Sequence, residues 1–180
     1  MELFRNSLSN RLDDLLSGEI RLRVVGDLSR LPSDVQSMVN SSTTSTEGCT
    51  RLNLTLAMSY GAREEILSAT KKLALKVASG EMDVEAINHS SFEKSLWTSE
   101  LPDPDLLIRS SGEMRVSNFL LWQIAYSEIV VTPEYWPDFD EEIIYRSLVD
   151  YSKRERRFGK TSKQLVNEAT PTLKAASGVS

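Results

Sequence analysis

The chain has 180 residues, of which 40% are apolar, 7% aromatic and 26% charged. These proportions are typical of a folded soluble domain, and they exclude collagen-like, low-complexity and wholly disordered chains. The 21 basic and 26 acidic residues give a formal net charge of -5. Proteins that bind nucleic acid need a basic excess to contact phosphates, so we expect no nucleic-acid partner.

Cysteine and histidine chemistry is poorly supported. Cys49 is the single cysteine of the chain and His89 is the single histidine. An internal disulfide is therefore excluded, and no second Cys or His stands near Cys49 at the spacing of zinc ligands. A Cys–His catalytic pair is equally unsupported.

Hydrophobic periodicity predicts alternating helices and strands in the first half of the chain. The expected elements, in order, are a helix from Leu3 to Gly18, a strand at 20–25, a helix starting at 32–34, a loop at 41–48, a strand at 52–56 and a helix from about Arg63 to Gly80.

The same pattern continues in the second half. It predicts a helix at 83–97, a strand at 105–109, a helix capped by Ser117, a strand at 128–131, a helix at 140–157 and a disordered tail. Strands that alternate with helices imply right-handed crossovers and a parallel sheet with helices on both faces. We expect one α/β domain over residues 1–159 and a disordered tail over 160–180.

The stretch from Arg109 to Ser117 holds the richest set of candidate ligand-binding groups. In open α/β sheets, ligands bind beyond the carboxyl ends of the strands, which is where Arg109 stands. Arg115 adds a second guanidinium, residues 110–115 form a small-residue loop with free N–H groups, and Ser117 opens a helix. Guanidinium forks and helix N-termini both bind phosphate oxygens, so the pattern favours a diphosphate pocket. A second interpretation stays open, in which Arg109 pairs with Glu113 and Ser117 is only a helix cap.

Two charged features follow this stretch. Glu128 starts the next strand, and a carboxylate close to a diphosphate usually shares a bound Mg²⁺ with it. Considered alone, Glu128 is better interpreted as a solvated residue at a strand edge. The basic run at 153–157 is, by itself, typical of a solvated helix end.

The sequence from Asp103 to Glu128 closely resembles the signature of the cis-prenyltransferases, which are the undecaprenyl, dehydrodolichyl and polyprenyl diphosphate synthases. Further similar stretches lie at 22–27, 59–65, 136–139 and 154–159. The similarity extends from about Leu3 to Gly159. It implies an α/β fold of the cis-prenyltransferase type, with a parallel sheet between helices.

The resemblance also implies an activity, which is transfer of prenyl groups. Members of the family condense isopentenyl diphosphate onto an allylic diphosphate, with Mg²⁺, and make polyprenyl diphosphates. Carried over by motif, Arg109, Arg115 and Ser117 would hold the diphosphate of isopentenyl diphosphate. Glu128 would help to organise Mg²⁺.

A dimer is implied in the same way. Arg157 and Gly159, in the Arg157-Phe158-Gly159 motif, would reach the active site of a partner subunit. The partner would be an identical chain in a homodimer or a related subunit in a heterodimer.

The chain departs from the family pattern at two places. The family's Asn-Tyr-Gly-Gly-Arg stretch has Ser59 and Ala62 here in place of Asn and the second Gly. More severely, nothing matches the Met-Asp-Gly-Asn-Arg-Arg-Trp stretch, whose Asp and following loop hold Mg²⁺ and the allylic diphosphate. We therefore expect the later part of an N-terminally truncated fold, with no assigned catalytic residue and little or no activity alone.

Two other functions are compatible with parts of the sequence. The first is a non-catalytic partner subunit of a heteromeric cis-prenyltransferase. The second is a small diphosphate- or nucleotide-binding module, which is disfavoured because no Gly-rich loop with Lys-Ser or Lys-Thr occurs.

The sequence gives little guidance on location. No apolar run reaches the roughly 20 residues that a membrane-spanning helix needs, and the first residues have neither signal-peptide nor transit-peptide composition. We expect the cytoplasm or the surface of the endoplasmic reticulum, or a plastid if a transit peptide precedes the chain. Lipid products would favour peripheral membrane association. Product length and primer stay open.

Overall fold

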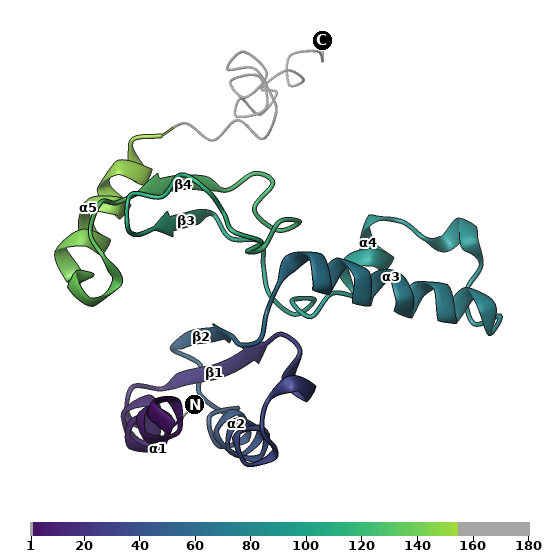
Figure 1. Ribbon diagram of the computed structural model, residues 1–180, viewed down its shortest axis with the longest axis horizontal. Coiled ribbons are helices and arrows are strands. Elements are labelled where there is room, and N and C mark those ends of the chain that lie inside the picture. Colours follow the sequence, from purple (N-terminus) through teal and green to yellow (C-terminus); the bar gives the residue numbers. More distant parts are fainter. Residues whose placement is uncertain (1, 155–180) are drawn as a thin grey trace, which may run out of the picture. The chain divides into compact units, whose positions relative to one another are not determined.

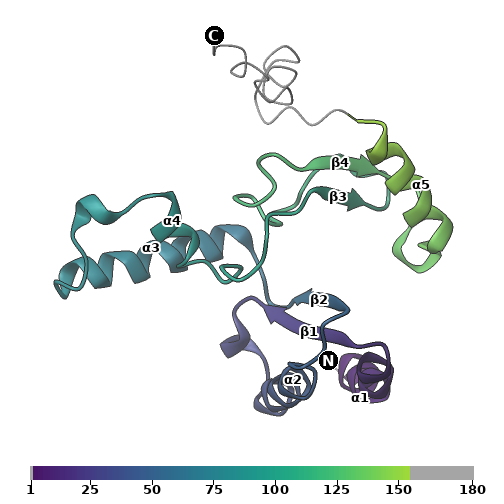
Figure 2. The ribbon, with the colours of Figure 1, turned by 180° about the vertical axis from the view of Figure 1, so that it is seen from behind.

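The computed structural model describes the backbone of residues 2–154 and the side chains of residues 10–154 (Figures 1 and 2). The chain divides into two compact units. The first unit comprises Met1–Asp103 and Val116–Gln123, and the second comprises Pro104–Arg115 and the chain from Ile124 onward. The tail expected at 160–180 lies outside the described residues.

A parallel strand pair organises the first unit. Strands β1 (Ile20–Val25) and β2 (Leu52–Ala57) are paired in continuous register, and both match the predicted strands. Helices α1 (Glu2–Ser17) and α2 (Ser33–Ser45) pack against β1, on the same side of the strand pair in both views (Figures 1 and 2). The short 3₁₀ helix η1 (Leu28–Arg30) precedes α2.

The core of this strand–helix layer forms where apolar side chains of the strand meet those of the helices. Leu22 of β1 is 2% exposed and packs with Leu15 of α1. Val35 and Val39, one helical turn apart on α2, are also buried. Burial of such side chains removes apolar surface from water and stabilises the layer.

The loop predicted at 41–48 is partly wrong, because α2 continues to Ser45. Serine and threonine side chains in this helix satisfy their hydroxyls locally on backbone carbonyls, as Thr43 does on that of Val39 at 3.0 Å. Thr46 then turns inward, where its hydroxyl accepts a hydrogen bond from the Leu22 N–H at 3.0 Å. The fully buried Thr46 thus satisfies a backbone donor that the strand pairing leaves free.

Helix α3 (Ala62–Ala78) follows β2 and confirms the helix predicted from about Arg63 to Gly80. The long helix predicted at 83–97 is wrong. That segment forms the 3₁₀ helix η2 (Val84–Ala86) and the short helix α4 (His89–Glu93), followed by turns. Asp83 and Asn88 each accept a hydrogen bond from a backbone N–H just after them, and such caps start new helices instead of extending one.

The second unit has a parallel pair of its own. Strands β3 (Leu106–Arg109) and β4 (Glu128–Val131) are paired from Leu106–Glu128 to Arg109–Val131, as predicted. After the 3₁₀ helix η3 (Trp136–Asp138), helix α5 (Glu141–Ser152) packs against β4. Asp140 caps α5 by accepting a hydrogen bond from the Ile143 N–H at 3.1 Å.

The helix predicted to begin at Ser117 is absent from the described structure. Residues 117–126 form turns, and Ser117, Asn118 and Leu120 have φ values of 48°, 63° and 48°. Left-handed backbone of this kind interrupts the repeating hydrogen bonds of an α-helix. Among the helices of residues 2–154, none is long and apolar enough to span a bilayer.

Candidate anion-binding site

Two arginines meet on one carboxylate in the second unit. Arg109, the last residue of β3, donates from Nη2 to Oε2 of Glu113, and Arg115 donates from Nη2 to Oε1 of the same residue. The side chains of Arg109 and Glu113 are about one third exposed, and that of Arg115 is 68% exposed. The structure therefore gathers both predicted arginines around an anion, and that anion is the Glu113 of the alternative interpretation.

The loop between the arginines folds back on the segment after β4. Ser111 and Gly112 have φ values of 70° and 66°. Their N–H groups donate to the carbonyls of Glu134, at 2.7 Å, and Thr132, at 2.8 Å. The expectation that this loop offers free N–H donors is wrong for both residues, so the guanidinium groups are the main donors of this cluster.

The guanidinium of Arg109 is only partly used. Its Nη2 is engaged by Glu113, whereas its buried Nε has no hydrogen-bond partner. Arginine presents its donors as a fork that matches two oxygens of a phosphate or carboxylate. The Nε–H of Arg109, one of the donors of this fork, is therefore unpaired beside the ion pair.

Ser117 belongs to the first unit, and no helix N-terminus is present there. The helix-dipole contribution predicted for the site is consequently wrong. The next residue, Asn118, caps α3 instead. Its Oδ1 accepts a hydrogen bond from the Arg63 N–H at 2.9 Å, and its backbone carbonyl accepts one from the Ala62 N–H at 2.9 Å.

Asn118 also reaches the first turn of α3. Its Nδ2 donates to the Glu64 carboxylate at 3.0 Å, and this hydrogen bond lowers the pKa of Glu64. The start of α3, which carries the 59–65 family stretch, is thus fixed by a residue of the 103–128 stretch.

A buried carboxylate, that of Glu65, joins α3 to further segments of the first unit. Glu65 of α3 is 0% exposed. Its Oε1 accepts hydrogen bonds from the Thr98 N–H and hydroxyl, both at 3.0 Å. Its Oε2 accepts from the Tyr60 hydroxyl at 2.6 Å and from Nε2 of Gln123 at 3.0 Å.

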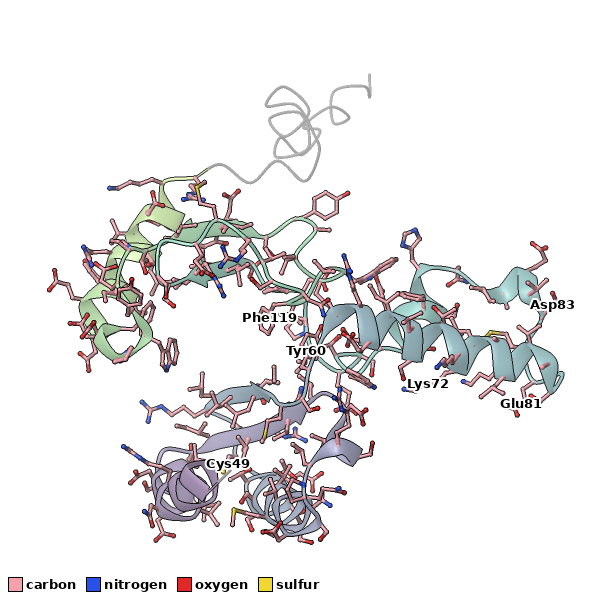
Figure 3. The ribbon with its side chains drawn as sticks, viewed as in Figure 1. Cys49, Tyr60, Lys72, Glu81, Asp83 and Phe119 are labelled. Atoms are coloured by element: carbon pink, nitrogen blue, oxygen red, sulfur yellow. The ribbon has the colours of Figure 1, made fainter. Side chains whose placement is uncertain are left out.

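The Tyr60 ring lies close to Phe119 near the start of α3 (Figure 3). Its centroid is 5.8 Å from that of Phe119 and 6.1 Å from that of Trp97, both in edge-on geometry. Burial, and then the hydrogen bond to Glu65, strongly raise the pKa of Tyr60. One overlooked signal for this cluster is present in the sequence, which is the charged Glu65 on the apolar face of α3.

Glu128 is ion-paired. Nη1 of Arg154 lies 3.0 Å from Oε2 of Glu128 and also donates to the Ile129 carbonyl at 2.9 Å, while Nη2 of Arg154 donates to the Asp150 carboxylate. The bond to Glu128 is the main cause of the raised pKa of Arg154. Arg154, predicted as part of a solvated helix end, therefore ties the end of α5 to the start of β4.

These residues do not form a metal site by themselves. Among the described side chains, those of residues 10–154, no three of His, Cys, Asp or Glu are grouped as metal ligands, and Glu128 is held by Arg154. We assign no metal-dependent step to them. Arg157 and Gly159, predicted to reach a partner subunit, lie outside the described residues.

Comparison with known proteins identifies the family. A family model of undecaprenyl diphosphate synthases matches residues 1–159. An isoprenyl transferase of Geobacter sulfurreducens is 46% identical over 165 residues, which are 92% of this chain and 67% of the relative. A ditrans,polycis-undecaprenyl-diphosphate synthase of Vibrio parahaemolyticus, named as (2E,6E)-farnesyl-diphosphate specific, is 42% identical over 92% of this chain and 66% of its own length.

A solved structure shows the same fold. The lavandulyl diphosphate synthase of Lavandula x intermedia, in complex with dimethylallyl diphosphate, matches with a TM-score of 0.86 and 35% identity, over 89% of this chain and 70% of that chain. The predicted α/β class and the prediction of a family of prenyl-group transferases are confirmed. The chain spans about two thirds of the length of these relatives, and it belongs to the undecaprenyl diphosphate synthase family of cis-prenyltransferases.

Proposed function

We propose that this chain takes part in cis-prenyl transfer, the condensation of isopentenyl diphosphate onto an allylic diphosphate. Family membership supports this activity, because the relatives are named as isoprenyl transferases and undecaprenyl diphosphate synthases. In such a condensation the alkene forms the new carbon–carbon bond, the allylic carbon–oxygen bond breaks with loss of diphosphate, and a proton leaves the alkene partner.

The convergence of Arg109 and Arg115 on one carboxylate is the observation that carries the proposal. Both guanidinium groups hold an anionic group, the Glu113 carboxylate, at the carboxyl end of β3. We assign them to the diphosphate of isopentenyl diphosphate, and the resemblance adds the hydroxyl of Ser117. The diphosphate on this substrate does not leave, so the role of the arginines is to bind it and orient its alkene.

Several finer assignments come from the resemblance and extend the proposal. They are a requirement for Mg²⁺ near Glu128, a homodimer or heterodimer to which Arg157 and Gly159 contribute, and polyprenyl or dolichol-type products. The proposed location is the cytoplasm, the surface of the endoplasmic reticulum or a plastid.

We further propose that the 180 residues alone elongate prenyl chains little or not at all. The alternative role is that of a non-catalytic subunit that supports an active partner. Retention of both arginines favours substrate binding over a purely supporting role, because a supporting subunit has no need of them.

The test measures incorporation of labelled isopentenyl diphosphate into butanol-extractable product, with farnesyl diphosphate and Mg²⁺. The purified chain is assayed alone and with a full-length homologous subunit, beside Arg115→Ala and the control Arg146→Ala. Arg146 is a matched control because it is an exposed arginine of the same unit that pairs with Glu134.

The outcomes separate the roles. Stimulation of the full-length subunit that Arg115→Ala loses and Arg146→Ala keeps would support a functional substrate site. Equal stimulation by both variants would support the partner role. Product from the chain alone would contradict the proposed inactivity, and no effect in any mixture would contradict both roles.

A further inference from the structure

The strongest unexplained feature of the second unit is the position of Glu113. Its two carboxylate oxygens are divided between the two arginines, with Oε2 bonded to Arg109 and Oε1 bonded to Arg115. A bound phosphate would present oxygens to the same two donors. Glu113 therefore occupies the place of an anionic ligand.

The contacts of Glu113 use the arginines incompletely. Only one nitrogen of each guanidinium is engaged, and the buried Nε of Arg109 has no partner. A phosphate group carries three terminal oxygens and more charge than a carboxylate, so it can satisfy Nε and Nη2 of Arg109 together. A diphosphate can thus form more hydrogen bonds, and stronger ones, with the two guanidinium groups than the Glu113 carboxylate does.

Exposure makes Glu113 replaceable. With 31% of the Glu113 side chain and 68% of the Arg115 side chain exposed, water screens the ion pairs. Ion pairs of such exposure contribute little to stability, so releasing Glu113 costs little. Once released, its side chain can be solvated.

We propose that Glu113 is a built-in occupant of the arginine pair, which a diphosphate must displace in order to bind. This inference rests on the proposed function, since it treats Arg109 and Arg115 as the diphosphate-binding groups. Glu113 is then an affinity-determining residue. Its carboxylate lowers the affinity for diphosphate and keeps weakly charged anions from occupying the site.

An alternative role for Glu113 predicts the opposite effect of its substitution on diphosphate binding. If Glu113 only orients the arginines, removing its carboxylate disorders them and weakens anion binding. Direct binding of inorganic diphosphate distinguishes the two roles without any turnover.

The experiment is a calorimetric titration of the full chain with inorganic diphosphate, in the presence of a chelator. Glu113→Gln removes the negative charge and keeps the shape, and Glu113→Ala removes the whole competing group. The control Glu142→Gln makes the same charge change at an exposed position in the first turn of α5. Arg115→Ala tests the arginine pair itself.

We expect Glu113→Gln to bind diphosphate about fivefold more tightly than the unsubstituted chain, a gain at the upper end of the range for exposed ion pairs. Glu113→Ala should bind at least as tightly, Glu142→Gln should be unchanged, and Arg115→Ala should bind far more weakly. Unchanged or weaker binding by both Glu113 variants would overturn the role of Glu113 while leaving the proposed site intact. Binding that survives Arg115→Ala, or no binding by any variant, would overturn the arginine site and with it both proposals.

Discussion

The side-chain amide of Gln123 lies 3.0 Å from the carboxylate of Glu65, 58 residues earlier in the chain. The same carboxylate receives the Thr98 N–H and hydroxyl and the Tyr60 hydroxyl. Residues from three segments, around positions 60, 98 and 123, therefore donate hydrogen bonds to one fully buried carboxylate. Because a buried carboxylate is costly unless its oxygens are hydrogen-bonded, these segments are held together by a single residue.

The first prediction is that Glu65→Gln is strongly destabilising. The new amide would present an NH₂ group where the carboxylate has only acceptors, and at least one donor among Thr98, Tyr60 and Gln123 would lose its partner. Burying an unsatisfied polar group costs about 1–3 kcal/mol. We expect a loss of about that size in the free energy of unfolding, measured by urea denaturation.

Glu64→Gln is the matched control for this variant. Glu64 is the preceding residue of α3, it is exposed, and its hydrogen bond from Asn118 can also be accepted by an amide oxygen. Its effect should be clearly smaller. Equal losses of unfolding free energy in the two variants would show that the hydrogen bonds to the buried Glu65 contribute no more to stability than the exposed one to Glu64.

The second prediction concerns the ionisation of Tyr60. Because burial and Glu65 raise its pKa far above the ordinary value of 10.0, Tyr60 should remain protonated when other tyrosines ionise. Tyr60→Phe should therefore leave the tyrosinate absorbance of the folded protein at about pH 10.5 unchanged. A loss of one tyrosine's share of that absorbance would contradict the prediction.

The raised pKa also fixes the sign of a stability change. A group whose folded-state pKa is raised holds its proton more tightly when folded, so its contribution is complete below pH 10 and falls as the pH rises above that value. The unfolding free energy should decline from about pH 10 upward, and the decline should be less steep in Tyr60→Phe.

Local sequence pattern predicted the four strands and the helices α1, α3 and α5 well, but it wrongly predicted helices at 83–97 and from Ser117. The alternating strand predicted at 20–25 is confirmed, and so is the apolar strand predicted at 105–109, which the structure has at Leu106–Arg109, because burial of one or both faces leaves a clear signature. The expected helix at 83–97 failed because Asp83 and Asn88 compete for nearby backbone N–H groups. Such local competition leaves no mark in the spacing of apolar residues.

For the candidate site, the sequence correctly predicted that Arg109 and Arg115 lie together, but it wrongly predicted a helix beginning at Ser117. The pairing of Arg109 with Glu113 follows from spacing along the chain. The left-handed φ values of Ser117 and Asn118 do not, because they accompany a contact of Asn118 with Arg63, 55 positions earlier in the chain. The bond between Arg154 and Glu128 joins residues 26 positions apart, and no local pattern encodes it.

The third prediction is that Glu128 and Arg154 are energetically coupled. Their side chains are 29% and 31% exposed, so we expect a coupling free energy of about 0.5–1 kcal/mol at low salt from a double-mutant cycle of Glu128→Gln and Arg154→Ala. The coupling should shrink at high salt, because ions screen exposed charges. Strictly additive effects at low salt would show that the pair contributes nothing.

Arg154→Ala should also cost more than Glu128→Gln. It removes the bonds to Asp150 and to the Ile129 carbonyl as well as the bond to Glu128. Hydrogen exchange offers a second readout, with faster exchange at the end of α5 in Arg154→Ala than in Glu128→Gln.

The fourth prediction is that Gly26, just after β1, tolerates no side chain. Its φ is 128°, and a Cβ placed on it would lie 2.0 Å from the carbonyl oxygen of Met58 in the backbone after β2. Neither backbone can retreat easily, because the Met58 N–H is bonded to the Val25 carbonyl at 2.9 Å. Gly26→Ala should therefore lower the free energy of unfolding by about 3 kcal/mol or more, or prevent folding altogether.

Two other glycines separate the causes of this loss. Gly80 has a φ of 75° and no atom within 4 Å of the position that a Cβ would take, so Gly80→Ala should cost only the left-handed backbone penalty of about 1–2 kcal/mol. Gly48 has neither the positive φ nor a neighbour within 4 Å, and Gly48→Ala should change stability by less than about 0.5 kcal/mol. Thermal unfolding of the three variants should give this order. If Gly26→Ala were no worse than Gly80→Ala, backbone strain alone would account for both, and the close approach of the two strand ends would be relieved at little cost.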